Sequence, residues 1–203
     1  MFKRFLTVSI LLATHLAPAL AADNTVVVIG DSLSSGYGLG SGPSWVTMLA
    51  DRLGTKAYGY EVVNASIAGD TSAGGLARLP RLLASHDPAI VIIELGGNDG
   101  LRGQPVSQLR QNLARMIEAV QNSGARVVLA GIQIPPNYGP TYTESLAAVY
   151  GELSADYGVA LVPFLMDGVA LKPELMQGDG IHPNVAGQAP MLENVWSVLK
   201  ALL

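Results

Sequence analysis

Five short runs of apolar, largely β-branched residues recur along this sequence, and each is separated from the next by a segment of helical character. The runs cover residues 25–29, 61–64, 89–95, 126–132 and 159–164. They are continuously apolar rather than alternating, which is typical of strands that are covered on both faces. Strands that alternate with helices predict βαβ units and a mostly parallel sheet. With right-handed crossovers, the expected fold class is α/β, a three-layer α/β/α sandwich.

The expected helices lie between these runs. The clearest has apolar residues spaced three or four apart, followed by Gly124 as a C-terminal cap: Val106, Leu109, Leu113, Ile117 and Val120. The other helical segments are 44–53, 75–83, 143–157 and 184–203. No repeat or linker interrupts the pattern, so we expect residues 22–203 to form a single domain that is large enough to bury a substantial core.

The N-terminal segment has the pattern of a secretory signal peptide. Lys3 and Arg4 precede an apolar stretch over 5–16 that is too short to span a bilayer. Pro18 follows, and then Ala19-Leu20-Ala21 has the form of a signal-peptidase site. A short buried helix at the start of the domain would explain the apolar stretch alone, but not this order of features. We therefore expect residues 1–21 to be cleaved and the protein to be periplasmic or secreted.

The amino-acid composition excludes several kinds of functional site and partner. The 203 residues include no cysteine, which excludes disulfides, thiolate metal sites and a cysteine nucleophile. Cleavage after residue 21 removes two of the 12 basic residues and leaves 10 against 16 acidic ones, a net charge of −6. That charge gives no basic footprint for nucleic acid. The remaining 182 residues contain no second long apolar run, so we expect no transmembrane anchor.

Polar, glycine-containing loops follow four of the expected strands, at residues 30–33, 64–70, 96–99 and 134–139. The carboxyl ends of parallel strands share one edge of the sheet, where ligands bind in such folds. Ser32 lies in the first of these loops. By itself it is best explained as an N-cap serine. A serine nucleophile would need a base within hydrogen-bond reach, usually histidine.

The three histidines can be sorted by position. His15 leaves with the signal peptide, and His86 lies in a segment entering the third strand, where we expect a surface loop at the amino end of the sheet. His182 remains, and Asp179 stands three residues before it. A tight turn can direct that carboxylate at the imidazole, fix its tautomer and stabilise the imidazolium. Ser32, His182 and Asp179 are therefore the expected nucleophile, base and orienting acid.

Acyl transfer also requires donors where negative charge develops on the carbonyl oxygen. The candidates are the backbone N–H groups of Ser32 and Gly69 and the side-chain amide of Asn98. Ordinary turn residues would explain Gly69 and Asn98 equally well if each were considered alone. The motifs of two other classes of protein are absent from the sequence. It has no G-x-S-x-G nucleophile elbow, as lipases have, and neither the G-x-G-x-x-G nor the G-K-[ST] motif of nucleotide-binding sites.

Four sequence blocks resemble the GDSL, or SGNH, hydrolase family. They are Gly30-Asp31-Ser32-Leu33, the segment 64–71 with Gly69, Gly96-Gly97-Asn98-Asp99, and Asp179-Gly180-Ile181-His182-Pro183, and they occur in family order. Segments 96–103, 134–139 and 171–173 are further similar to the bacterial periplasmic subgroup with thioesterase I, lysophospholipase, arylesterase and protease I activities. The resemblance implies a flavodoxin-like five-stranded sheet of order 2-1-3-4-5. It also implies a catalytic triad of Ser32, Asp179 and His182, and an oxyanion hole of Ser32, Gly69 and Asn98.

The implied activity is that of a serine esterase/thioesterase acting on aryl esters, acyl-CoA and lysophospholipids, without metal or cofactor. The expected partners are these small acyl substrates alone, and the expected state is a monomer. Candidates for the acyl-binding wall are Leu101, Ile134, Pro135 and Tyr138, although mutual packing of their two loops explains them equally well. Two alternatives remain open: a carbohydrate acetylesterase with the same triad, and a non-catalytic acyl-chain or glycan-binding module.

Overall fold

Two of the apolar runs of the sequence form neighbouring interior strands of the sheet. The computed structural model describes residues 24–54 and 58–203, so the expected signal peptide at 1–21 lies outside the described residues. Strand β1 (Thr25–Gly30) and strand β3 (Ile90–Glu94) are buried along their whole length. Both faces of these strands are covered, which explains why neither shows an alternation of polar and apolar residues.

The five strands form one parallel sheet of order β2-β1-β3-β4-β5. Strand β2 (Glu61–Asn64) and strand β5 (Ala160–Val162) lie at the edges and are less buried than β1, β3 and β4 (Arg126–Ala130). Val27 pairs with Val63 on one side and Val91 on the other, so β1 is an interior strand although it comes first in the sequence. The sheet order implied by the family resemblance is confirmed.

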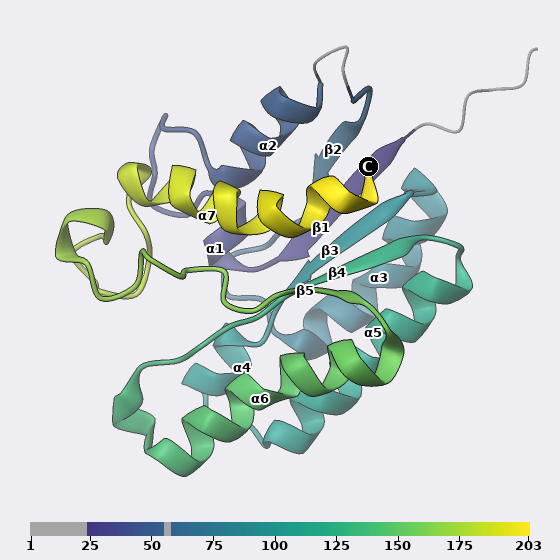
Figure 1. The fold of residues 1–203 in the computed structure, drawn as a ribbon. Coiled ribbons are helices and arrows are strands. Elements are labelled where there is room, and N and C mark those ends of the chain that lie inside the picture. Colours follow the sequence, from purple (N-terminus) through teal and green to yellow (C-terminus); the bar gives the residue numbers. More distant parts are fainter. Residues whose placement is uncertain (1–23, 55–57) are drawn as a thin grey trace, which may run out of the picture.

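Helices cover both faces of this sheet (Figure 1). Helices α2 (Trp45–Leu53) and α7 (Val185–Leu199) pack together on one face. Helices α3 (Ser72–His86), α5 (Val106–Asn122) and α6 (Pro140–Tyr157) form the layer on the other. The expected three-layer sandwich is therefore the observed one. Single turns complete the described chain: α1 (Ser32–Ser35), α4 (Gly97–Leu101), η1 (Pro136–Tyr138), η2 (Pro173–Leu175) and η3 (Lys200–Leu202).

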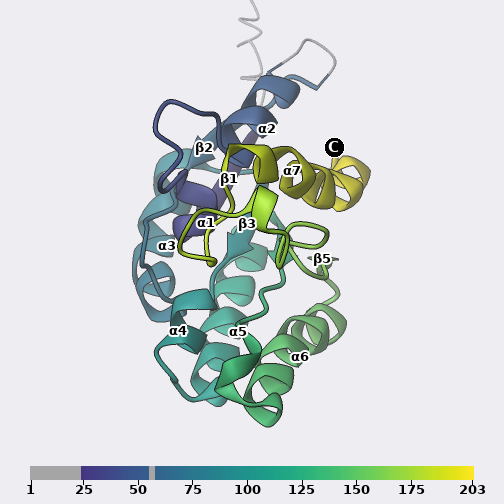
Figure 2. The same cartoon turned by 90° about the vertical axis from the view of Figure 1, so that its left-hand side faces the viewer.

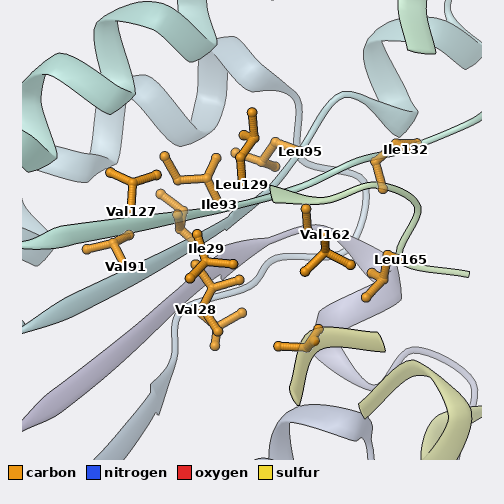
Figure 3. Close-up of a cluster of buried hydrophobic side chains, with 14 of the residues drawn as sticks. Val28, Ile29, Val91, Ile93, Leu95, Val127, Leu129, Ile132, Val162 and Leu165 are labelled. Carbon is orange, nitrogen blue, oxygen red and sulfur yellow. The ribbon is translucent and has the colours of Figure 1, made fainter. Parts of the chain in front are cut away.

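Branched aliphatic side chains from the strands fill the space between the layers (Figure 3). Ile29, Ile93 and Leu129 come from three neighbouring strands, and each is fully buried. Successive residues of a strand point to opposite faces, so a fully apolar strand supplies core to both helical layers. Within the described residues, no helix is both long and apolar enough to cross a membrane.

The observed element boundaries correct three expectations. Helix α3 begins at Ser72 and ends at His86, longer than the expected 75–83, because Thr71 caps it by accepting from the Gly74 N–H. His86 is therefore the last helical residue and not a loop residue, although it still precedes β3 at the amino end of the sheet. Asn98 lies in helix α4 rather than in a loop.

Candidate active site

The carboxyl ends of the strands lie at the end of the molecule that faces the viewer in Figure 2. Helices α1 and α4 follow β1 and β3 there, and the long segment between β5 and α7 runs past them. The expected convergence of loops on this edge is therefore observed. It brings together residues from the first and the last parts of the sequence.

Ser32 is the first residue of α1, and the residue that caps this helix is Asp31. The Asp31 carboxylate accepts from the Leu33 N–H at 3.0 Å, which is the bond expected of an N-cap side chain. The explanation of Ser32 as a capping serine is therefore wrong. Its hydroxyl is instead 2.9 Å from Nε2 of His182, across 150 positions of sequence.

His182 is held in turn by Asp179. Oδ2 of Asp179 lies 2.6 Å from Nδ1 of His182, while Oδ1 accepts the backbone N–H groups of Ile181 at 2.9 Å and His182 at 3.0 Å. These hydrogen bonds, led by the one from the His182 backbone, lower the pKa of Asp179 to about 2. The carboxylate is an acceptor only, so Nδ1 carries the proton and Nε2 is free to accept from the Ser32 hydroxyl.

Two residues that sequence reasoning missed support the imidazole. The ring of Tyr37 packs against that of His182, with centroids 4.7 Å apart. The Gln177 side chain donates to the carbonyl oxygens of Tyr37 and Pro183 at 3.0 Å each. A Cβ on Gly38 would lie 2.2 Å from the Gln177 side chain, so glycine is needed where the two loops meet. Tyr37 lies in the glycine-rich segment 36–40, which therefore allows close contact between the two loops.

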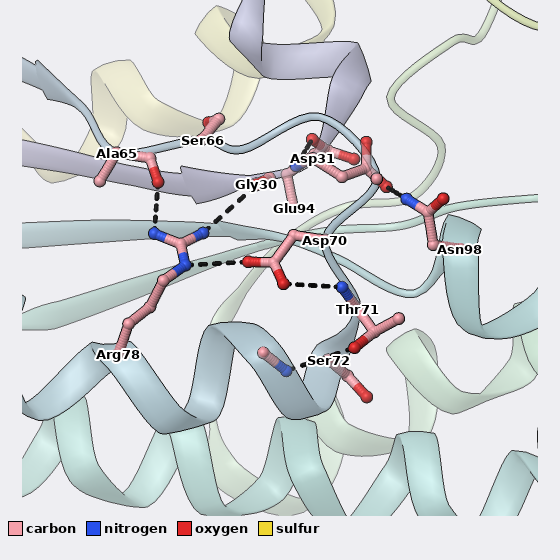
Figure 4. A network of polar contacts seen from close by, with 12 residues as sticks. Gly30, Asp31, Ala65, Ser66, Asp70, Thr71, Ser72, Arg78, Glu94 and Asn98 are labelled. Atoms are coloured by element: carbon pink, nitrogen blue, oxygen red, sulfur yellow. Dashed lines mark hydrogen bonds and ion pairs between the residues drawn. The ribbon is translucent and has the colours of Figure 1, made fainter.

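Asn98 is tied to the residue before the serine. Its Nδ2 donates to Oδ2 of Asp31 at 3.0 Å (Figure 4). An amide nitrogen has two hydrogens, so this bond uses only one of them. Asp31 itself is buried, and burial raises its pKa to about 6 despite the hydrogen bonds from Leu33 and Asn98.

Glu94 lies behind Asp31 at the end of β3 and is fully buried. Its Oε2 accepts the Asp31 N–H at 3.2 Å and the Ser34 hydroxyl at 2.6 Å. Its Oε1 has no hydrogen-bond partner among the described residues. Burial, and then the negative charge of Asp31, raise the pKa of Glu94 well above its ordinary value, so Glu94 is the neutral member of the pair. A single acid inside an apolar strand was the sequence signal for this group.

Gly69 lies in the exposed loop between β2 and α3, with φ near +80°. That left-handed conformation favours glycine, which is why the position has no side chain. Its carbonyl accepts from the Arg102 side chain at 2.8 Å. The structure thus brings the segments that carry Ser32, Gly69, Asn98 and His182 to one edge of the sheet.

The four candidate residues for an acyl-binding wall differ in burial and in their contacts. Ile134 is buried, and a Cβ on Gly100 would meet it at 2.8 Å, so it packs against α4. Tyr138 is partly exposed and donates from its hydroxyl to the Leu101 carbonyl at 2.9 Å. Pro135 is exposed. These contacts are those of two loops packed on each other, and a role in binding an acyl chain stays a prediction.

We also searched the described part of the chain for side chains that could bind a metal ion. No group of three or more His, Asp or Glu side chains there is arranged to hold a metal ion. The groups gathered at this edge are instead a hydroxyl, an imidazole, carboxyl groups and amide donors. That set is suited to proton transfer and nucleophilic attack on a carbonyl carbon.

A parallel sheet of this order, with a serine–histidine–aspartate set at its carboxyl edge, defines a class of acyl-hydrolysing enzymes. Residues 28–189 match the model of the GDSL-like lipase/acylhydrolase family, and the chain belongs to that family. The resemblance found in the sequence is thereby confirmed, and the chain is an enzyme that hydrolyses acyl bonds.

Several known proteins are similar to this chain over most of their length. Esterase TesA of Pseudomonas aeruginosa is 54% identical over 200 residues, which cover 98% of this chain and all of that protein. The thioesterase 1/protease 1/lysophospholipase L1 of Escherichia coli K12 is 48% identical over 81% of this chain and 77% of its own. A crystal structure of TesA is 56% identical with a TM-score of 0.85, covering 88% of this chain and 99% of that one.

Proposed function

We propose that this protein is a serine esterase/thioesterase in which Ser32 is the nucleophile, His182 the general base and Asp179 the residue that orients it. One observation carries the proposal: Asp179 Oδ2, His182 and Ser32 Oγ form a continuous hydrogen-bonded chain with steps of 2.6 Å and 2.9 Å. The first step fixes the tautomer, and the second places an unprotonated nitrogen against the hydroxyl that must lose its proton.

The reaction follows from this arrangement. His182 Nε2 takes the proton of Ser32 as Oγ attacks the acyl carbon, and the charged imidazole is stabilised by Asp179. The proton then passes from Nε2 to the departing alcohol or thiol, which leaves Ser32 acylated. In the second half, water gives a proton to His182 Nε2 and attacks the acyl carbon. The bond from that carbon to Ser32 Oγ then breaks, Nε2 returns the proton to Oγ, and the acid is released.

The negative charge of each tetrahedral intermediate needs donors, which we assign to the backbone N–H groups of Ser32 and Gly69 and to Asn98. The Ser32 N–H belongs to the first turn of α1, whose terminal N–H groups have no partner within the helix. The bond from Asn98 to Asp31 leaves one hydrogen of the amide for the oxyanion. Each such donor is worth about 10²–10³ in turnover.

We propose carboxylic esters and acyl thioesters as the substrates, with aryl esters, acyl-CoA and lysophospholipids as the types to examine. Both named relatives support this range, since one is called an esterase and the other a thioesterase and lysophospholipase. Exposed apolar side chains at this end of the molecule would suit an acyl chain: Tyr37, Ile67 and Ile181. We assign Leu101, Ile134, Pro135 and Tyr138 to the same wall.

Replacing Ser32 with alanine tests the nucleophile. The triad predicts that turnover of p-nitrophenyl butyrate falls by about 10⁴-fold or more, because no other group can form the acyl-enzyme. A fluorophosphonate probe should label the wild type once and leave Ser32→Ala unlabelled. Unchanged turnover or labelling in purified Ser32→Ala would exclude the mechanism and favour a non-catalytic acyl-chain or glycan-binding module.

The second candidate, a carbohydrate acetylesterase, uses the same triad and differs in the acyl group that it accepts. The exposed apolar side chains of this edge favour longer chains. A series of p-nitrophenyl esters from acetate to dodecanoate should therefore show kcat/KM rising with chain length. A maximum at acetate with rejection of longer chains would instead identify an acetylesterase.

We further propose that residues 1–21 are a signal peptide and that the enzyme is periplasmic and monomeric. The order of Lys3-Arg4, an apolar stretch and Ala19-Leu20-Ala21 supports export. Mass spectrometry of the protein from a periplasmic fraction should find an N-terminus at Ala22, and light scattering should give the mass of one chain. An intact N-terminus in the cytosolic fraction would contradict the assignment.

A further inference from the structure

Arg78 on helix α3 reaches up to the carboxyl edge of the sheet and bonds three segments there (Figure 4). Its Nε donates to Oδ2 of Asp70 at 2.8 Å, its Nη1 to the Ala65 carbonyl, and its Nη2 to the Gly30 carbonyl at 3.4 Å. None of these groups belongs to the triad. Each one, however, lies in a segment that carries a proposed oxyanion donor.

The three acceptors mark where those donors are attached. Gly30 ends β1 and stands two residues before Ser32. Ala65 and Asp70 lie at the two ends of the loop that contains Gly69, with Asp70 directly beside it. The guanidinium therefore connects the segment that presents the Ser32 N–H to the loop that presents the Gly69 N–H.

The Arg78–Asp70 pair is largely shielded from water. The two side chains are 21% and 13% exposed, so their attraction is screened less than that of a surface pair. The other carboxylate oxygen of Asp70 accepts the Thr71 N–H at 2.9 Å. A Cβ on Gly74 would lie 1.9 Å from that oxygen, so glycine at the start of α3 makes room for the carboxylate.

The loop also has backbone bonds that do not depend on Arg78. The Ala65 N–H donates to the Val28 carbonyl at 2.8 Å, and the Ile67 N–H donates to the Gly30 carbonyl at 3.0 Å. These bonds hold the course of the loop as it leaves β2. The far end, near Gly69, also has the Asp70 N–H bond to the Ile67 carbonyl at 3.0 Å and the exposed Arg102 bond to the Gly69 carbonyl at 2.8 Å. Loss of Arg78 is therefore expected to shift this end of the loop rather than to unfold it.

We propose that Arg78 is a positioning residue of the oxyanion hole, which sets the Gly69 N–H relative to the Ser32 N–H. The inference rests on the proposed function, since it assumes that these two groups bind the oxyanion. Donors of this kind act only when they lie about 2.7–3.1 Å from the developing charge, so a small shift of the loop costs transition-state stabilisation. A planar guanidinium can reach three acceptors in fixed directions, which a lysine ammonium on a flexible stem cannot reproduce.

The test compares Arg78→Met, Arg78→Lys and a matched control, Arg81→Met, which removes the same charge from the exposed side of the same helix. With p-nitrophenyl butyrate, Arg78→Met should lose about 10- to 100-fold in kcat while KM stays within about two-fold. Arg78→Lys should fall between Arg78→Met and the wild type, and Arg81→Met should match the wild type. A kcat for Arg78→Met within about two-fold of Arg81→Met would overturn the proposal.

Binding of a tetrahedral analogue separates positioning from mere stability. The inhibition constant of an alkylboronic acid should rise in Arg78→Met by the same factor as kcat/KM falls. A lower melting temperature with unchanged kcat and unchanged boronate inhibition would show a structural role only and would overturn the proposal. If Arg78→Met does not fold, Asp70→Asn takes its place, since it removes the ion pair and keeps the shape; an unchanged kcat there overturns the proposal equally.

Ser32→Ala, assayed beside these variants, distinguishes failure of the proposed function from failure of the positioning role of Arg78. Activity that persists in Ser32→Ala would refute the proposed function itself. An inactive Ser32→Ala together with fully active Arg78 variants would refute only the positioning role.

Discussion

Two buried carboxyl groups, those of Asp31 and Glu94, determine how the residues around Ser32 are held. Asp31 caps α1 with one oxygen and accepts from Asn98 with the other, so one side chain orients both the helix of Ser32 and a proposed oxyanion donor. Glu94, kept neutral by burial and by the charge of Asp31, fixes the Asp31 backbone and Ser34 from below. The chemistry at the surface is thus supported by residues with no direct part in it.

Replacing Asp31 with asparagine should test this support. The variant keeps the volume but has one acceptor oxygen where the wild type has two, so either the cap or the bond to Asn98 is lost. We expect kcat for p-nitrophenyl butyrate to fall by about 10-fold with little change in KM, because Asn98 is then free to turn. Asp51→Asn, which alters an exposed acid on α2, is the control, and equal kcat values in the two variants would contradict the role of Asp31.

The elements of this fold were largely readable from the sequence, because apolar runs and helical spacing recur with little ambiguity. The first residue of α3 could not be predicted, because Gly74 and Gly75 weaken the helical pattern near the point where the Thr71 cap starts the helix. The Asn98 block looked like a loop for the same reason, being rich in glycine. Glycine lowers helix propensity, but caps and packing decide where helices begin.

The sequence predicted those residues of the candidate site that have a recognisable position relative to a strand or to each other. Ser32 and Asn98 come shortly after β1 and β3, where a parallel sheet collects its functional groups, whereas His182 was identified by its spacing from Asp179 and by the positions of the other histidines. Tyr37 and Gln177 were not found, because their contact joins segments 140 residues apart and no local pattern marks it. Such contacts depend on how two loops cross, which only the folded chain defines.

The turn between η2 and α7 depends on one cap, which provides a test for this element. Asn184 accepts the N–H groups of Ala186 at 2.8 Å and Gly187 at 3.2 Å, and its amide donates to the carbonyls of Glu174 and Met176. Asn184→Ala should lower the free energy of unfolding by about 1–2 kcal/mol in urea titrations. Asn184→Asp should lose less, because it keeps the cap; an equal loss in both variants would place the effect in the amide donors instead.

At the scale of the whole molecule, stability comes from the continuous apolar core rather than from surface charge. The ion pairs of Arg110 with Glu152 and Asp156 join α5 to α6, but their side chains are exposed, and such pairs contribute little. The buried Glu94 is different, because its protonation is linked to folding of the entire chain.

Glu94 should therefore make global stability depend on pH. Its pKa in the folded state lies above the ordinary 4.5, so above that pH unfolding releases a proton and the free energy of unfolding falls as pH rises. Asp31, whose pKa burial raises to about 6, contributes to the same fall, but in Glu94→Gln, whose amide oxygen can still accept from Asp31 and Ser34, the part caused by Glu94 should be absent. Urea titrations from about pH 5 to pH 9 should show the stability of Glu94→Gln relative to the wild type increasing with pH; parallel profiles would contradict the assignment.

The proposed nucleophile, Ser32, follows the first strand, and its proposed base, His182, precedes the last helix. A chain that stops anywhere before residue 182 can contain the serine, the glycine and the asparagine of the site, and yet it has nothing to remove the serine proton. On the proposed mechanism, the chain therefore gains esterase activity only after nearly all of it has been synthesised. Turnover can for that reason serve as a direct assay of complete folding.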